Sequence, residues 1–451
     1  MTINKYQLPK DSALLTQDFV FGVATSSYQI EGGINEGGRS PSIWDTFCKM
    51  PGKVDKGDSG DVACDHYHLW KQDIEMIADL GVDAYRLSMA WPRILPQDGV
   101  VNPEGLKFYE QIIDECHARG LKVYVTLYHW DLPQYLEDKG GWLNRETAYK
   151  FAEYADVVSA HFGNKIDVYS TLNEPFVAAF LGYRWGEHAP GIEGDKEGFL
   201  ASHHLMLGHG LAMPILRKNA PESQHGVVFN ASPCYPLTQQ DQSAADYCEA
   251  ENYHWFVDPV LKGEYPALVK ERHAANMPMV LKGDLEIISA PVDYIGINYY
   301  SRGVAHYNEH GDIENVKPEG AEYTYIGWEV YPQGLTDLLV RFKERYDNLP
   351  PLYITENGAA CNDESRDGVV VDTQRVAYFQ SHLEAVDQAI RAGVRVDGYF
   401  AWSLMDNFEW AFGYEQRFGI VHVDYVTQKR TLKQSAVAYR NMLLERAEEN
   451  K

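Results

Sequence analysis

The sequence predicts a closed parallel (β/α)8 barrel, the TIM-barrel class of α/β fold. Eight short, nearly continuous apolar runs recur along the chain, and stretches with helical spacing of apolar residues separate them. Strands that are buried on both faces and alternate with helices are typical of parallel sheets. No stretch of sequence reads as a linker between two halves. We therefore expect one domain over residues 1–451, with residues 1–17 as a loose lead-in; an open doubly wound sheet is the alternative.

The expected elements follow from these runs in chain order. Strands are expected at 19–25, 84–90, 122–128, 168–174, 226–230, 294–300, 352–356 and 396–403. Helices are expected at about 66–80, 106–119, 145–162, 200–218, 334–346 and 373–392. The stretch 32–61 is rich in Gly, Asp, Lys and Pro, which predicts a long loop. Long loops on a compact domain commonly carry function.

Composition and charge narrow the class of partner. The formal net charge is −25, which argues against nucleic acid and anionic membranes, because both select a basic face. No apolar run approaches the length of a membrane-spanning helix, and the polar N-terminal stretch lacks the apolar core of a signal peptide. We expect a cytoplasmic protein whose six scattered cysteines are reduced thiols.

A carboxylate ends two of the expected strands. The run 352–355 leads into Glu356, and the run 168–172 leads into Asn173 and Glu174. Burying an unpaired carboxylate is costly, so each of these residues needs a partner or a task. Strand ends converge on one mouth of such a barrel, so we expect the two carboxylates to face each other. Two facing carboxylates are the minimal equipment for cleaving a glycosidic bond.

The two carboxylates are expected to differ in protonation. Arg86, on the second strand, is a partner that would hold Glu356 ionised. A nearby anion would raise the pKa of Glu174 and keep its proton in place. A separation of about 5 Å between them would retain the configuration of the sugar, and roughly 6.5–9.5 Å would invert it. The sequence alone leaves this distance open.

Other polar and aromatic residues recur at the strand ends, and packing alone does not explain their coincidence at so many separate places. They are Gln29, Arg86, His129, Trp130, Asn173, Asn298, Tyr300 and Trp402. The histidines at 66, 68, 203, 204 and 209 have metal-like spacing, but no set of Cys or carboxylates completes a ligand sphere. We expect these histidines to be structural and the protein to need neither metal nor cofactor.

Several stretches resemble the signatures of glycoside hydrolase family 1. They are Thr171-Leu172-Asn173-Glu174-Pro175, Ile354-Thr355-Glu356-Asn357-Gly358, the run from Ser27 to Gly32, and Tyr85-Arg86-Leu87-Ser88. The resemblance runs from about Phe19 to about Asn441, with the motifs in the correct order. It implies that Glu174 is the acid/base and Glu356 the nucleophile of a retaining reaction.

The resemblance also implies roles for the surrounding residues. Arg86 and Tyr300 would hold the nucleophile, Asn298 would lie close to Glu174 and the sugar, and Asn173 would bind the sugar 2-hydroxyl. The other implied sugar ligands are Gln29, His129, Trp130, Glu409 and Trp410, with Trp402 as stacking floor, Phe418 closing the pocket and Trp328 on the aglycone side.

Two positions refine the expected substrate. Glu409 stands where the 6-phosphoglycosidase branch of the family has a phosphate site, which favours a free sugar, and Glu rather than Gln at 174 favours O-glycosides. We expect a β-glucosidase that acts by double displacement on cello-oligosaccharides and on aryl or alkyl β-glucosides, with β-galactosidase or β-fucosidase side activity. The alternatives are a 6-phospho-β-glucosidase and a non-catalytic glycan-binding relative. The expected partner is a small glycoside, and a homo-oligomer stays open.

Overall fold

Eight parallel strands form a closed barrel in the computed structural model, which describes residues 4–366 and 368–450, with backbone alone for 364–366. Neighbouring strands pair in chain order, and β1 pairs with β13 to close the ring. The barrel strands are β1 (Val20–Ala24), β2 (Ala84–Ser88), β3 (Lys122–Tyr128), β4 (Val168–Asn173), β5 (Gln224–Asn230), β7 (Tyr294–Asn298), β10 (Leu352–Asn357) and β13 (Val396–Trp402). The predicted fold class is confirmed.

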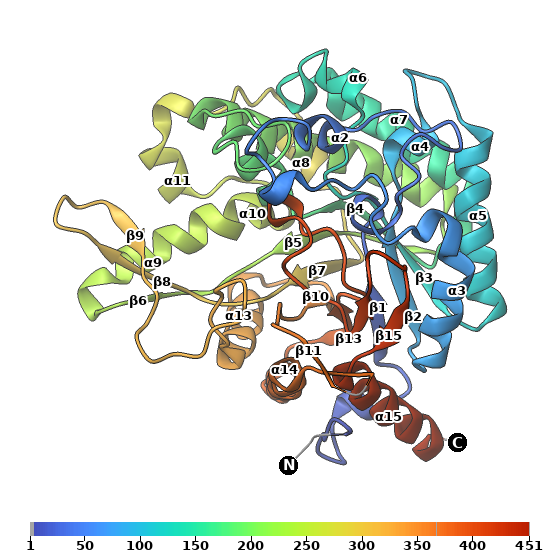
Figure 1. The fold of residues 1–451 in the computed structure, drawn as a ribbon. Coiled ribbons are helices and arrows are strands. Elements are labelled where there is room, and N and C mark those ends of the chain that lie inside the picture. Colours follow the sequence, from blue (N-terminus) through green and yellow to red (C-terminus); the bar gives the residue numbers. More distant parts are fainter. Residues whose placement is uncertain (1–3, 367, 451) are drawn as a thin grey trace.

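Helices connect the strands and surround the barrel (Figure 1). The long ones are α3 (His66–Asp79), α5 (Pro103–Ala118), α7 (Glu146–Phe162), α8 (Asp195–Asn219), α13 (Pro332–Arg345), α14 (Thr373–Arg391) and the C-terminal α15 (Gln434–Glu449). This alternation is the βα repeat of the barrel class.

Some boundaries differ from the prediction for local reasons. Helix α5 begins at Pro103, three residues before the first residue expected, because the Asn102 side chain accepts the Glu104 N–H at 3.2 Å and proline suits the first helical position. Helix α8 begins at Asp195, ahead of the expected residue 200, and carries acidic residues in its first turn. The loop 32–61 contains the short helix α2 (Ile43–Phe47), which a Ser42–Asp45 capping box starts.

Two excursions leave the barrel repeat and were not predicted. Between β5 and β7 lie β6 (Cys234–Pro236) and the helices α9 (Gln242–Glu249), α10 (Trp255–Leu261), α11 (Ala267–Arg272) and α12 (Asp284–Ile288). After β7, strands β8 (Gly303–Tyr307) and β9 (Ile313–Asn315) join β6 in a small sheet that projects to one side (Figure 1). Two further hairpins, β11 (Glu364–Arg366) with β12 (Val369–Val371) and β14 (Val421–Val423) with β15 (Arg430–Leu432), follow later strands.

Aromatic side chains fill the lower part of the barrel interior. Tyr124, Tyr294, Tyr353 and Phe400 are buried and contact one another edge to face or tilted, with ring centroids 4.9 to 5.7 Å apart. Glycine on the adjacent strand makes room for one of these rings, because a Cβ on Gly22, the register partner of Phe400, would lie 2.3 Å from the Phe400 ring. This plug leaves the opposite end of the barrel, where the strands terminate, as the place for a pocket.

Residues 4–17, expected as part of a loose lead-in, pack against helices α14 and α15. In residues 4–17, Tyr6 and Leu14 are buried, and Ser12 Oγ donates to Asp387 at 2.5 Å. Arg446 of α15 donates to the carbonyls of Thr16 and Phe19. The chain ends therefore lie on the same side of the molecule (Figure 1).

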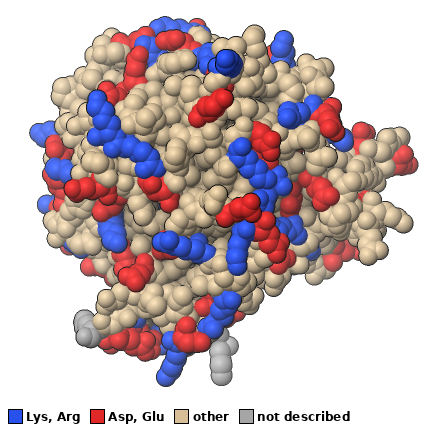
Figure 2. Space-filling model, turned by 180° about the vertical axis from the view of Figure 1, so that it is seen from behind, with Lys and Arg blue, Asp and Glu red and all other residues tan. Residues whose placement is uncertain are grey.

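The surface mixes both signs of charge. On the face seen in Figure 2, Lys and Arg alternate with Asp and Glu, and broad areas carry neither. Within the described ranges, no helix combines the length and apolar character needed to cross a bilayer.

We predict that Gly210→Ala destabilises the fold. A Cβ at this position of α8 would lie 2.2 Å from the Ile287 carbonyl oxygen of α12, so backbone must move. The expected loss is about 1–3 kcal/mol of unfolding free energy, measured by chemical denaturation. The control is Gly208→Ala in the same helix, where the nearest atom is Cδ1 of the Phe151 ring at 3.3 Å. Equal effects of the two substitutions would contradict the prediction.

Candidate active site

The two strand-end carboxylates lie at the same end of the barrel. Glu174 follows β4 directly and Glu356 lies in β10, and both are buried. Glu174 has a positive φ of 47°, a backbone conformation that residues other than glycine adopt rarely. Asn298, at the end of β7, donates from Nδ2 to Glu174 Oε1 at 2.6 Å. This hydrogen bond opposes the rise in the pKa of Glu174 that burial causes.

Arg86 connects three strands at this point. Its guanidinium donates to Glu356 Oε1 at 2.8 Å and to Asn173 Oδ1 at 2.7 Å. Asn173 Oδ1 accepts a second hydrogen bond from Asn298 at 3.0 Å. The Tyr300 hydroxyl donates to the other oxygen of Glu356 at 2.6 Å. Glu356 is thus held from two sides, as the sequence predicts for Arg86 and Tyr300.

Glu174 and Glu356 differ in protonation because they have different hydrogen-bond donors. Burial and the neighbouring Glu356 charge raise the pKa of Glu174 to about 8, against the weaker opposing effect of Asn298 and Arg86. Burial also raises the pKa of Glu356, but Arg86 and the Tyr300 hydroxyl oppose that rise directly. Near neutral pH the proton is therefore held on Glu174, and Glu356 is the ionised member of the pair.

A cavity of about 140 Å³ lies above these carboxylates, and we call it the inner pocket. Its lining includes most of the sugar-binding residues expected from the sequence, namely His129, Trp130, Trp328, Trp402, Glu409, Trp410 and Phe418, together with Tyr300 and both carboxylates. Gln29, Asn173, Asn298 and Arg86 are buried immediately behind that lining. The structure thus brings the predicted residues together at one place.

Hydrogen bonds fix the orientation of the polar lining. Gln29 Nε2 donates to the Phe408 carbonyl at 2.8 Å and to Glu409 Oε2 at 3.4 Å. Trp130 Nε1 donates to the Asn173 carbonyl at 2.8 Å. Trp130 has a positive φ of 75°, and Trp410 one of 52°, so the backbone is strained at both indoles.

Two more titratable groups of the inner pocket have shifted protonation. Burial and the Glu356 charge raise the pKa of Glu409 to about 8. Burial lowers the pKa of His129 well below its usual value, with Arg86 adding to the effect. His129 is therefore a neutral imidazole, and its Nε2 lies 3.2 Å from Asn173 Nδ2.

A wider cavity of about 680 Å³ opens beyond the inner pocket, and we call it the outer pocket. Phe176 and Trp185, which follow β4, and Trp328, which follows β7, give it aromatic walls, while Asn230 and Asn252 give it polar groups. Trp328 lines both pockets and stands at the boundary between them.

Sequence reasoning missed several residues of the inner pocket, including Val177, Leu181, His188 and Phe412. His188 packs edge-on to Trp44, with ring centroids 5.2 Å apart, and burial lowers its pKa to about 3. Val177 and Leu181 lie in a π-helical turn over Val177–Leu181, and Phe412 ends a 3-10 helix over Trp410–Phe412. These turns are too short for apolar periodicity to mark them. The sequence signal for His188 is its place in a stretch with two glycines and a proline, 186–191, which predicts a turn.

The spaced histidines have protein partners. His66 Nδ1 lies 2.8 Å from Asp73, His203 Nε2 lies 2.7 Å from Asp284, and His209 Nδ1 lies 2.7 Å from the Thr171 hydroxyl. No group of three or more metal-ligating side chains occurs within residues 4–366 and 368–450. All six cysteines are free thiols.

A (β/α)8 barrel that holds one protonated and one ionised carboxyl group beneath an indole-lined pocket defines a glycoside hydrolase. Comparison with known proteins specifies which: the chain belongs to glycosyl hydrolase family 1, whose family model matches residues 11–448.

Curated relatives cover nearly the whole chain. It is 47% identical over 430 residues to a β-glucosidase of Agrobacterium sp., which covers 94% of both chains. It is 42% identical to a bifunctional β-D-glucosidase/β-D-fucosidase of Bifidobacterium breve, covering 95% of this chain and 98% of that one. The Thermotoga maritima β-glucosidase in complex with noeuromycin superposes with a TM-score of 0.93 at 45% identity, covering 96% of this chain and 98% of that one.

We predict that Glu174→Gln stabilises the protein more at pH 8 than at pH 5. A carboxyl group whose folded pKa is raised to about 8 binds its proton more tightly in the folded state, so its contribution to stability is lost as pH rises from about 4.5 toward 8. The amide cannot ionise and still offers an oxygen to Asn298. The measurement is the melting temperature of variant and wild type at both pH values.

The control for this experiment is Glu319→Gln, a change at an exposed position outside both pockets. Its effect on the melting temperature should be the same at the two pH values. A Glu174→Gln effect that is also independent of pH would show that the carboxyl group titrates normally.

Proposed function

We propose that the protein is a retaining β-glucosidase that releases terminal β-D-glucosyl residues by double displacement. The observation that carries this proposal is the pair of buried carboxyl groups at one end of the barrel, with the proton held on Glu174 and Glu356 kept ionised by Arg86. A proton donor beside an ionised nucleophile is what a retaining glycosidase requires. We propose that one domain, comprising the whole chain, carries this activity.

In this mechanism Glu174 donates its proton to the leaving oxygen while Glu356 attacks the anomeric carbon. Proton donation leaves Glu174 as a carboxylate, which then takes a proton from water as that water displaces Glu356 from the sugar. Arg86 and Tyr300 position Glu356 and share its charge before and after the covalent step. Asn173, whose side-chain oxygen already accepts two hydrogen bonds, is oriented toward the sugar 2-hydroxyl.

A short series of hydrogen bonds between the two carboxyl groups supports retention over inversion. Asn298 Nδ2 donates to both Glu174 and Asn173, and Arg86 donates to both Asn173 and Glu356. The Glu356 charge, after burial, also raises the pKa of Glu174. Two carboxyl groups about 5 Å apart would suit a covalent glycosyl-enzyme, and we propose that they lie at this separation.

The inner pocket favours an uncharged sugar. Its lining includes three carboxyl groups and, among the described residues, no Lys or Arg. A 6-phosphoglycoside would place two negative charges in a buried site without a cation to balance them. Glu409 and Gln29 instead offer hydrogen-bonding groups for the sugar 4- and 6-hydroxyls, and Trp402 offers a flat face. A 6-phospho-β-glucosidase is therefore disfavoured.

The outer pocket suits a second sugar or an aromatic aglycone. Its volume of about 680 Å³ lies within the range of sites for small molecules, and it combines indole walls with amide groups. We propose cello-oligosaccharides, from cellulose breakdown, and aryl or alkyl β-glucosides as substrates. The bifunctional relative from Bifidobacterium breve supports a side activity on β-D-fucosides, and we extend the same proposal to β-galactosides. A non-catalytic glycan-binding role is disfavoured because both carboxylates and their donors are present.

Azide rescue tests the two assignments. We expect Glu356→Gly to lower kcat by at least about 10⁴-fold, the scale seen when a covalent nucleophile is removed. Azide should restore turnover of p-nitrophenyl β-D-glucoside with the α-glucosyl azide as product, because azide enters the space of the lost carboxylate. With Glu174→Ala, azide should attack the glycosyl-enzyme and yield the β-glucosyl azide. The reverse pattern of products, read by NMR, would exchange the two roles.

Replacement of Glu409 tests the sugar specificity. We expect Glu409→Ser to lower kcat/KM for p-nitrophenyl β-D-glucoside by about 10²-fold, the effect of losing two hydrogen bonds to a carboxyl group. The variant should not gain activity on the 6-phosphoglucoside, because the inner pocket still lacks a cation. Unchanged glucoside kinetics, or substantial 6-phosphoglucoside cleavage, would contradict this view of the pocket.

A further inference from the structure

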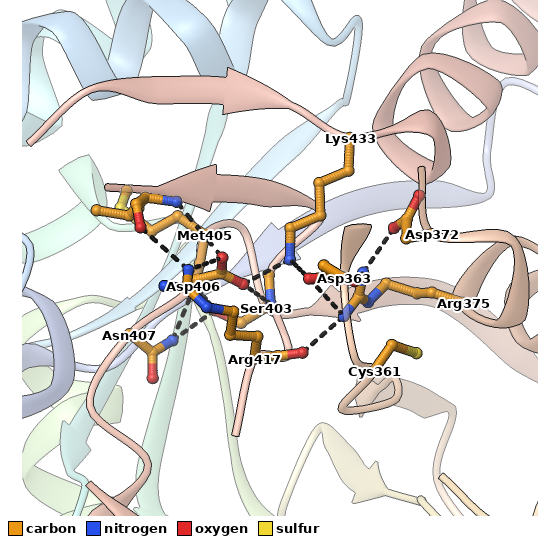
Figure 3. A network of polar contacts seen from close by, with 12 residues as sticks. Cys361, Asp363, Asp372, Arg375, Ser403, Met405, Asp406, Asn407, Arg417 and Lys433 are labelled. Carbon is orange, nitrogen blue, oxygen red and sulfur yellow. Dashed lines mark hydrogen bonds and ion pairs between the residues drawn. The ribbon is translucent and has the colours of Figure 1, made fainter. Parts of the chain in front are cut away.

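A largely buried network of six charged side chains includes Asp406 of the loop 403–410 (Figure 3). The same loop carries Glu409. Three acids and three bases alternate in it, namely Asp363, Asp372 and Asp406 with Arg375, Arg417 and Lys433. The side chains of Asp406, Lys433 and Arg375 have no solvent exposure. None of the six lines the inner or the outer pocket.

Asp406 joins the two segments that form one side of the inner pocket. Its Oδ1 accepts hydrogen bonds from Lys433 Nζ at 2.6 Å and from the Gly419 N–H at 3.1 Å. Its Oδ2 accepts one from Arg417 at 2.6 Å. Gly419 follows Phe418 of the pocket wall, and a Cβ at Gly419 would lie only 2.0 Å from the Asp406 nitrogen. The loop with Glu409 and the segment with Phe418 are therefore locked together.

Asn407, the residue after Asp406, connects the network to the inner pocket through hydrogen bonds. Asn407 Nδ2 donates to Ser403 Oγ at 2.9 Å and to the Met405 carbonyl at 3.0 Å, so its side chain has one orientation (Figure 3). Asn407 Oδ1 then accepts from Gln29 Nε2 at 3.1 Å, and the same Nε2 reaches Glu409. A continuous path of contacts thus leads from Lys433 to the carboxyl group of Glu409.

The energetics of the network point to positioning and not to stability. Removing six charges from water is costly, and well-packed apolar side chains would stabilise a buried region at least as well as buried ion pairs. The ion pairs instead hold the side chains in one orientation, because each hydrogen bond constrains an angle as well as a distance.

We propose that Asp406 and Lys433 are positioning residues for recognition of the 4- and 6-hydroxyl groups of the sugar. They act through Asn407 and Gln29 on Glu409, and they do not touch the substrate. This inference rests on the proposed β-glucosidase function and adds to it the device that fixes its sugar specificity.

The test compares two substrates that differ in one hydroxyl group, p-nitrophenyl β-D-glucoside and p-nitrophenyl 6-deoxy-β-D-glucoside. Lys433→Met should lower kcat/KM for the glucoside by about 10- to 10²-fold, the cost of misplacing a binding group from a distance. For the 6-deoxy substrate, which lacks the hydroxyl proposed to bind Glu409, kcat/KM should fall by less than about 3-fold. The ratio of kcat/KM between the glucoside and the 6-deoxy substrate should therefore decrease. Lys433→Arg, which keeps the charge, should recover part of that preference.

Two further variants keep the test decisive. Arg417→Met removes another bond to Asp406 at a side chain that is 25% exposed, so it gives the same readout if Lys433→Met fails to fold. The control is Asp284→Asn in α12, another buried acid with several donors, among them Arg145 and His203. It should lower the melting temperature and leave the ratio of the two substrates unchanged.

The outcomes separate the two proposals. An equal loss on both substrates, or no loss on either, in variants that fold would contradict the positioning role alone. A wild-type enzyme that releases p-nitrophenol from neither substrate would contradict the proposed function, and this inference with it.

Discussion

The site depends on one guanidinium group that bonds to residues of two other strands. Arg86 rises from β2 and reaches Glu356 on β10 and Asn173 on β4, and these strands are not neighbours in the sheet. Such a contact is available only inside a closed barrel, where the strand ends surround a common axis. The ion pair between Arg86 and Glu356 therefore requires that β1 and β13 close the barrel. Arg86 in turn offsets part of the cost of burying the Glu356 carboxylate.

The inner pocket and the buried ion-pair network differ in their balance of acidic and basic side chains. The inner pocket holds Glu174, Glu356 and Glu409 with a single guanidinium nearby, so protons are retained there and two carboxyl pKa values rise to about 8. The ion-pair network has equal numbers of acids and bases, and the ion pairs lower the pKa of Asp406 despite its burial. The first arrangement creates groups that exchange protons, and the second creates a rigid support.

The sequence predicted what periodicity and strand-end chemistry can encode. The strand 122–128 matches β3 over its full length, because an apolar run between Gly120 and His129 has well-marked ends. Helix α5 begins three residues before the predicted start at 106, because the Asn102 cap and Pro103 set its start and not its first apolar residue. The helices α9 to α12 are short and follow no long repeat, so they escaped detection. His188 and the Asp406–Lys433 pair are brought to the site by tertiary packing between distant segments, which one-dimensional patterns do not record.

The placement of the chain ends has a practical consequence. Tyr6 packs near α15 through the Ser435 carbonyl, and Arg446 bonds to the carbonyl of Phe19, just before β1 begins. Both ends therefore dock where the barrel strands start, and the two carboxylates lie where the strands finish. An affinity tag, a carbohydrate-binding module or a surface linker attached at either end would point away from the entrance. Immobilised or fused forms should accordingly keep free access for bulky glycosides.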